Sequence, residues 1–218
     1  MKNAFILLLC ASLFACNQSS KKENATDTTA QATDSVKQPL LGDTAAHSAA
    51  STDTSVTKGV SADKLIVPGR SIGRIQLSED VANVSNLLGR PDSADAAMGS
   101  SLMVWFTQNH QPSGYRVSVF AHRKMGTKDE IISRIEKILV NSPEYKTAEG
   151  YGAWSSLDDI KKGYDLKPTD TYNHKSGKVQ IYTDLDKGIS FEINTENKCV
   201  GVVVHKAHDT ASANLNMH

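Results

Sequence analysis

The sequence has too few cysteines, in the wrong places, for a disulfide framework. Cys10 lies inside an apolar N-terminal run and Cys16 follows that run, which leaves Cys199 as the only cysteine of the part expected to fold. No intramolecular disulfide can therefore form there. A lone cysteine in a valine-rich run is typical of a small buried hydrophobic residue, and we expect Cys199 to be one. A reactive thiol is the alternative.

An excess of positive charge is also missing. Lys and Arg together number 24, Asp and Glu together number 24, and no strongly basic block interrupts the sequence. Proteins that bind nucleic acid present a concentrated positive patch to the phosphate backbone. The charge balance therefore argues against a nucleic-acid partner.

Several motifs of well-known reactions are missing too. There is no His-Glu-x-x-His pair, no Cys-x-x-Cys and no phosphate-binding glycine loop. Cys199 and His205 are six positions apart on one expected strand, and roughly 20 Å is too far for a nucleophile and its base. Asp184 and Asp186 favour a hairpin turn over a calcium loop, because the next glycine comes one position early and the closing glutamate is missing. We therefore predict no catalytic residue, no metal site and no cofactor.

The one long apolar run lies at the N-terminus. Lys2 precedes residues 4–14, which are too few to cross a bilayer comfortably as a helix. The run ends in Leu13-Phe14-Ala15-Cys16, which resembles the signal of bacterial lipoproteins, where a small residue precedes the cysteine that is lipidated. The resemblance implies that residues 1–16 are a signal peptide ending at the lipobox cysteine. An ordinary secretory signal cut near Ala15 is the alternative.

The same resemblance bears on location. Cys16 would carry acyl chains such as palmitate and hold the mature protein to a membrane without a transmembrane helix. Asn17 is not the aspartate that retains lipoproteins at the inner membrane of enteric bacteria. The resemblance therefore implies a Gram-negative lipoprotein anchored in the outer membrane, on either the periplasmic or the cell-surface side.

Residues 17–60 are rich in Ser, Thr, Ala and Asp and contain no Phe, Tyr or Trp. Such a stretch cannot bury enough apolar surface to offset its ordering entropy, so we predict a disordered tether. Three triplets in it resemble the Asp-Ser/Thr-small acceptors of a periplasmic O-glycosylation system of some Gram-negative bacteria, and chance occurrence is the alternative. The candidate acceptors are Thr28, Ser35 and Thr44.

Residues 61–208 are organised around a pattern that occurs twice. Residues 75–91 have a polar cap at Ser78, apolar positions at helical spacing and a stop at Gly89, and residues 153–164 repeat this order. Three runs rich in Val, Ile and aromatic residues follow each copy. We predict an α+β fold of two tandem copies, each a helix followed by three antiparallel strands, with the helices on one face of the sheet. Repeat 1 spans about 66–141, repeat 2 about 142–207, and residues 209–218 form a flexible tail.

Alternation along these strands assigns their side chains to two faces. The face away from the helices is polar with interleaved aromatic residues, a composition that protein interfaces favour. Trp105 and Trp154 are expected in the core, since aromatic side chains dominate burial. We predict a protein-binding site on the outward face, which Glu192 shares. Its residues are Arg116, Phe120, His122, Arg134 and Tyr182.

Residues 73–77, 88–91 and 188–193 carry a resemblance that spans about residues 66–206. They are similar to the tandem-repeat fold of the beta-lactamase inhibitory protein and to small lipoproteins of the outer-membrane assembly machinery, which carry one copy. Known members bind proteins, often across the concave outer face of the sheet. The resemblance implies a lipid-anchored, non-enzymatic envelope protein that binds or helps assemble another protein through the exposed sheet face. A cell-surface carbohydrate-binding module or hydrolase, and a structural spacer lipoprotein, are the alternatives.

Overall fold

A computed structural model of the chain describes residues 59–107, 109–213 and 217–218. The predicted signal peptide with Cys16, the predicted tether up to residue 58 and the three candidate glycosylation sites lie outside the described residues. Within the described ranges, no helix has the length and apolar character needed to cross a membrane.

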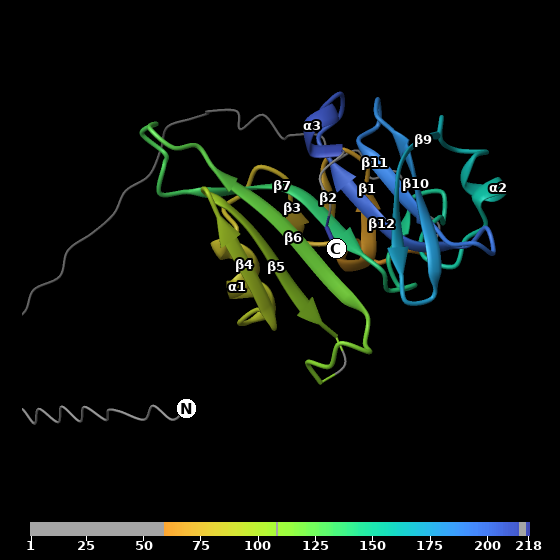
Figure 1. Ribbon diagram of the computed structural model, residues 1–218, viewed down its shortest axis with the longest axis horizontal. Coiled ribbons are helices and arrows are strands. Elements are labelled where there is room, and N and C mark those ends of the chain that lie inside the picture. The colour runs from red at the N-terminus through yellow and green to blue at the C-terminus, as the bar shows by residue number, and fades with distance from the viewer. Residues whose placement is uncertain (1–58, 108, 214–216) are drawn as a thin grey trace, which may run out of the picture. The chain divides into compact units, whose positions relative to one another are not determined.

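An antiparallel sheet of eight strands dominates the structure (Figure 1). Its middle is the pairing of β7 with β12, which brings Val202 opposite Val140 and joins the two halves of the folded chain. The strands run, in spatial order, β4 (Ser93–Ala97), β5 (Ser100–Phe106), β6 (Arg116–Arg123), β7 (Ser133–Val140), β12 (Cys199–His205), β11 (Ile189–Ile193), β10 (Gly177–Asp184) and β9 (Lys167–His174).

A second, smaller sheet is built from short strands. Its order is β3 (Ile75–Gln76), β2 (Ser71–Ile72), β1 (Leu65–Val67) and β8 (Lys146–Thr147), and β1 and β8 run parallel. The 3₁₀ turn η1 (Ala62–Lys64) leads into β1. Ile66, Ile72 and Ile75 of this sheet are buried and belong to the main core.

The helices are short, as Figure 1 shows. They are α1 (Ala82–Leu88), α2 (Leu157–Ile160) and α3 (Thr210–Ala213). Ser156 caps α2, because its hydroxyl accepts a hydrogen bond from the Asp159 amide. Ser78 does not cap α1: its φ is +68° and the cap position is Val81. Gly89, with φ +83°, ends α1 where the sequence places the stop.

The predicted fold class is wrong, because the protein is mostly β. The three α-helices of the described residues have seven, four and four residues, and each half of the chain gives four strands to the large sheet, not three. The sequence also did not reveal the small sheet or, in the large sheet, the edge strands β4 and β9. These two edge strands are exposed along nearly their whole length, so neither the small residues of β4 nor the polar residues of β9, which include Pro168, show apolar alternation.

The main core lies between one face of the large sheet and the elements that cover it. Val117, Val119 and Ala121 of β6 point into it, together with Phe191 of β11. Cys199 is also there and fully buried, which confirms the expectation of a small core residue, and burial raises the pKa of its thiol to about 12.

The two tryptophans differ in their surroundings. Trp105 is buried in the core, where its indole N–H donates to the Gly89 carbonyl at 2.9 Å. Trp154 is 59% exposed and has φ +73°, so the prediction that it is a core residue is wrong. A turn with left-handed backbone directs this side chain outward.

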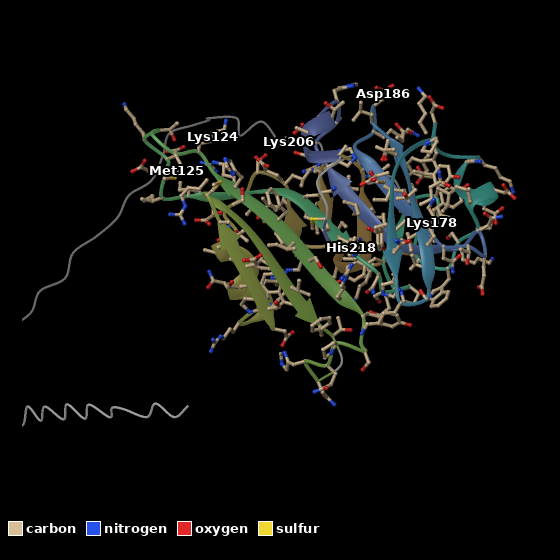
Figure 2. All side chains as sticks on the ribbon, viewed as in Figure 1. Lys124, Met125, Lys178, Asp186, Lys206 and His218 are labelled. Carbon is tan, nitrogen blue, oxygen red and sulfur yellow. The ribbon has the colours of Figure 1, made fainter. Side chains whose placement is uncertain are left out.

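Residues 209–213 and 217–218, which sequence analysis assigned to a flexible tail, lie against the other face of the large sheet. Helix α3 contacts β7, and Met217 and His218 reach the middle of the sheet. His218 lies between the β4–β7 half and the β9–β12 half (Figure 2). We call residues 209–213 and 217–218 the C-terminal segment, and the sheet face beneath it the outer face.

Candidate functional site

The outer face contains four of the five predicted binding residues. Arg116, Phe120 and His122 alternate on β6 with the core residues Val117, Val119 and Ala121 and therefore point the opposite way. Arg134 on β7 lies directly opposite His122, so it shares their face.

Tyr182 lies on the core face instead. It pairs with Phe191, whose side chain is in the main core, and residues paired across neighbouring strands share a face. Its ring packs against that core, and the Lys161 ammonium, just after α2, lies 5.6 Å from the ring centre. The expectation that Tyr182 joins Phe120 and Arg116 on one face is thus corrected. A shift of one position in the assumed register of β10 moves its whole set of side chains to the other face.

An apolar hollow occupies the centre of the outer face. Leu139 of β7 and Val203 of β12 form its floor, and the Met217 side chain of the C-terminal segment fills it, with only 3% of Met217 exposed. Leu102 and Phe120 pack against its side while remaining partly exposed. Phe120 therefore combines contact with a buried cluster and access from outside.

A polar clamp beside this hollow holds the His218 ring. Arg116 donates from Nη2 to Nδ1 of the imidazole, and Nε2 lies 2.7 Å from a carboxylate oxygen of Glu192. Because an arginine can only donate, Nδ1 accepts its hydrogen bond, and Nε2–H donates to Glu192. Tyr172 stacks on the ring with centroids 3.9 Å apart, and its hydroxyl donates to Glu192 at 3.2 Å. Burial raises the pKa of Tyr172, and the nearby Glu192 carboxylate adds to that effect.

Lys137 lies under the C-terminal segment. It is 3% exposed, and its ammonium donates to the Ala213 carbonyl at 3.0 Å. Burial lowers the pKa of Lys137 to about 8, although the Glu192 and Asp170 carboxylates act in the opposite direction. A buried ammonium bonded to a main-chain carbonyl is a strong point of attachment for a polypeptide.

Two buried donors on β6 have no hydrogen-bond partner among the described residues. They are Nε of Arg116 and the hydroxyl of Ser118, and both side chains point to the outer face. Buried polar atoms are nearly always paired in native proteins, and an unpaired one costs free energy. With the C-terminal segment in place, these two donors of the outer face therefore still lack an acceptor among the described residues.

A chain of hydroxyl groups ends at a buried histidine near α3. Ser190 lies between Thr183 at 2.8 Å and Nε2 of His205 at 3.2 Å, and Nδ1 of His205 donates to the Lys206 carbonyl at 2.9 Å. Burial lowers the pKa of His205 and keeps the ring neutral. Ser190 and His205 are 1% and 0% exposed, so no substrate reaches this hydroxyl–imidazole pair while the C-terminal segment is in place.

Three hollows surround the C-terminal segment on the outer face. One of about 450 Å³ lies beside the β6–β7 loop and is lined by charged groups of both signs, including Lys124, Arg134 and Glu136. A second, of about 240 Å³, adjoins Arg116, Tyr172 and Glu192. A third, also about 240 Å³, lies between β10 and α3. Thr210 and Ala213 of the C-terminal segment form part of the lining of the third hollow.

Metal ligation finds no support in the part of the chain that the structure describes. No three side chains of His, Cys, Asp or Glu are grouped there as a metal ion requires. Asp184 instead caps a turn, because its carboxylate accepts from the Lys187 amide at 3.0 Å and from the Asp165 amide at 3.0 Å.

Sequence analysis missed Tyr172, Lys137, Ser118 and the C-terminal segment. Tyr172 lies on a polar edge strand, Lys137 follows Glu136 on a strand of mixed polarity, and Ser118 stands between two valines. Nothing in the sequence shows that a later segment covers these residues. Met217 and His218 follow a polar stretch typical of a disordered tail. Their apolar and aromatic character is the only signal that could have indicated docking.

Comparison with known proteins gives distant structural likeness only. No protein-family model and no curated protein sequence matches the chain. A cysteine-rich secretory protein from Staphylococcus aureus shares 11% identity over 66% of this chain and 48% of its own, with a TM-score of 0.38. An extracellular protein with an SCP domain from Bacillus anthracis shares 14% identity over 61% and 44%, with a TM-score of 0.37. The chain thus spans about half the length of these structures.

Proposed function

We propose that this chain is a lipid-anchored, non-enzymatic protein of a Gram-negative envelope whose outer sheet face binds or helps assemble another protein. A single observation carries the binding part: this face already holds polypeptide, namely the C-terminal segment of the same chain. It does so with an apolar hollow for Met217 and a charged clamp for His218.

The composition of the outer face supports a protein ligand. Protein interfaces combine a buried apolar or aromatic centre with arginine and a polar rim. Leu139 and Val203 provide such a centre, Phe120 and Arg116 flank it, and the charged hollow at Arg134 supplies a rim. The described part of the C-terminal segment is short, so much of the eight-stranded face remains available to a larger partner.

The anchoring part of the proposal rests on the sequence. Acylation of Cys16 in place of a removed signal peptide would attach the protein to the outer membrane, and residues 17–60 would hold the folded part away from the lipid. A flexible chain of that length has an end-to-end distance of about 35–40 Å. The partner is then another protein of the cell envelope.

Neighbouring residues on the edge strand β4 allow a matched test. Asp95 pairs with Leu102 and points to the outer face, whereas Ala94 pairs with Met103 and points to the other face, and both are exposed. A photo-crosslinking amino acid is placed at each position in the full chain in cells. We expect one protein to be crosslinked from position 95 and not from position 94.

The captured protein is then identified, purified and titrated against the purified chain. A direct interaction that Phe120→Ala weakens supports the proposal. Equal crosslinking from positions 94 and 95, no crosslink from position 95, or no direct binding of the purified pair would contradict it.

A further inference from the structure

The C-terminal segment contacts the outer face as a bound peptide contacts a receptor. Met217 places an unbranched apolar side chain in a hollow, and His218 places a ring in a clamp. We propose that this segment is an intramolecular ligand of the outer face, and that the partner displaces it with a segment of the same chemistry plus an acidic group. This inference rests on the proposed function and names the chemistry of its ligand.

The apolar contact requires a flexible side chain. The hollow over Leu139 and Val203 is bordered by Leu102 and Phe120 and takes up nearly all of Met217. Methionine fits irregular hollows because three rotatable bonds and a polarizable sulfur adapt to their shape. We expect the displacing segment to bring methionine or leucine to this place.

The ring contact requires a flat group with a donor and an acceptor. Tyr172 stacks on one side of the imidazole, while Arg116 and Glu192 bind its two nitrogen atoms. These two residues come from β6 and β11, on opposite sides of the central β7–β12 pair. The ring therefore connects both halves of the sheet, and its departure leaves an arginine and a carboxylate free to take a new ligand.

The acidic group follows from what the C-terminal segment leaves unpaired. Nε of Arg116 and the Ser118 hydroxyl are buried donors without an acceptor among the described residues. A carboxylate from another protein that reaches them forms charge-assisted hydrogen bonds, which are stronger than bonds between neutral groups. A ligand with this group therefore binds more tightly than the C-terminal segment and displaces it.

The attachment of the segment permits displacement. Helix α3 is a single turn, which is marginal on its own, and it depends on Asp209, whose carboxylate accepts from the amides of Ala211 and Ser212. His208, just before it, has φ +61°, a left-handed conformation that favours a turn. Apart from the contacts of Met217 and His218 and the Lys137–Ala213 hydrogen bond, the segment thus depends on a turn and a few local contacts.

The inference is tested with a fluorescent synthetic peptide of residues 209–218. Its affinity is measured for the full chain and for a full chain carrying Met217→Asp and His218→Ala, which vacates the outer face. An intramolecular segment competes at a high effective concentration. We expect the peptide to bind the vacated chain at least about tenfold more tightly than the unmodified chain. Met125→Asp, at an exposed methionine elsewhere, is the matched control and should leave the affinity unchanged.

Two further variants locate the peptide. In the vacated chain, Arg116→Ala should abolish binding, whereas Arg123→Ala, at the exposed end of the same strand, should not. If the double variant does not fold, the single variant His218→Ala replaces it in these measurements. This substitution breaks the clamp without placing a charge in the apolar hollow.

A set of peptides with one aspartate at each position in turn tests the acidic group. At least one should bind the vacated chain several-fold more tightly than the parent peptide, and that gain should disappear in Ser118→Ala.

If the folded vacated chain binds no peptide, the segment is a fixed part of the structure and the inference fails. If no aspartate peptide gains affinity, the proposed ligand chemistry fails. The crosslink from position 95 tests the proposed function separately from either of these outcomes, because β4 does not contact the C-terminal segment through the residues described above.

Discussion

Arg116 on β6 and Glu192 on β11 are connected through the imidazole of His218, which accepts a hydrogen bond from the first and donates one to the second. Their strands are separated by β7 and β12. A residue 102 positions after Arg116 therefore spans the centre of the outer face.

Phe120 and Tyr182 should differ in their effect on partner binding. Phe120→Ala removes an aromatic side chain from the outer face beside the apolar hollow, and truncation of an aromatic hot-spot residue costs about 2 kcal/mol or more, a roughly thirty-fold loss of affinity. Tyr182→Ala removes a ring from the core face and should leave affinity unchanged. Titration of the purified partner checks both. A loss of affinity in Tyr182→Ala but not in Phe120→Ala would contradict the assignment of the interface to the outer face.

Met217→Ala should destabilise the folded chain. The side chain is almost fully buried against Leu139 and Val203, and truncation of a buried methionine to alanine leaves a cavity that costs about 2–5 kcal/mol, less where surrounding groups can relax. Urea unfolding measures the change. Met98→Ala, at a methionine that is 97% exposed, is the control and should have no effect. Equal stability of both variants would mean that the segment is not docked in solution.

Sequence analysis succeeded where a local pattern determines the structure. The alternation of Val117, Val119 and Ala121 with Arg116 and Phe120 gave both faces of β6 correctly, since a strand with one buried face repeats every two residues. The burial of Cys199 followed from its apolar neighbours in the same way.

It failed where the structure depends on partners that are distant in sequence. The polar edge strands β4 and β9 form because a neighbouring strand offers hydrogen-bonding groups, and their side chains carry no pattern. The face of Tyr182 depends on the register against β11, which period alone does not determine. The docking of Met217 depends on a hollow built from β7 and β12.

Lys137 should give the stability of the protein a distinct dependence on pH. Burial lowers the pKa of Lys137 to about 8 in the folded chain, below its ordinary value of 10.5. Between pH 8 and 10.5 the unfolded chain binds more protons than the folded chain, so this group makes the free energy of unfolding rise with pH. Below pH 8 its effect is constant and unfavourable.

Lys137→Met should abolish this rise. The difference in unfolding free energy, unmodified chain minus variant, is expected to increase between pH 8 and 10.5 with a slope of at most about 1.4 kcal/mol per pH unit. Lys178→Met, at an exposed lysine on β10, is the control. The free energies of unfolding of the unmodified chain and of Lys137→Met are plotted against pH. If the two plots stay parallel over this range, Lys137 is not buried beneath the segment.

Cys16→Ser should release the protein from the membrane fraction of a Gram-negative cell. Without its thiol the residue cannot be acylated, and attachment by the proposed anchor is lost. Fractionation and intact mass of the mature protein check this, the unmodified form being heavier by its acyl chains. Retention of Cys16→Ser in the membrane fraction would contradict the anchor, and Cys199→Ser, at a buried core residue, is the control for general effects of losing a cysteine.

The most direct test of the central claim, that the outer face is a surface for binding polypeptide, is the environment of the Met217 methyl group in solution. Nuclear magnetic resonance of the full chain with labelled methyl groups is predicted to show contacts from Met217 to Leu139 and Val203. These contacts should disappear when the purified partner is added. A Met217 methyl with the chemical shift of an unfolded chain and no contact to either residue would contradict the account.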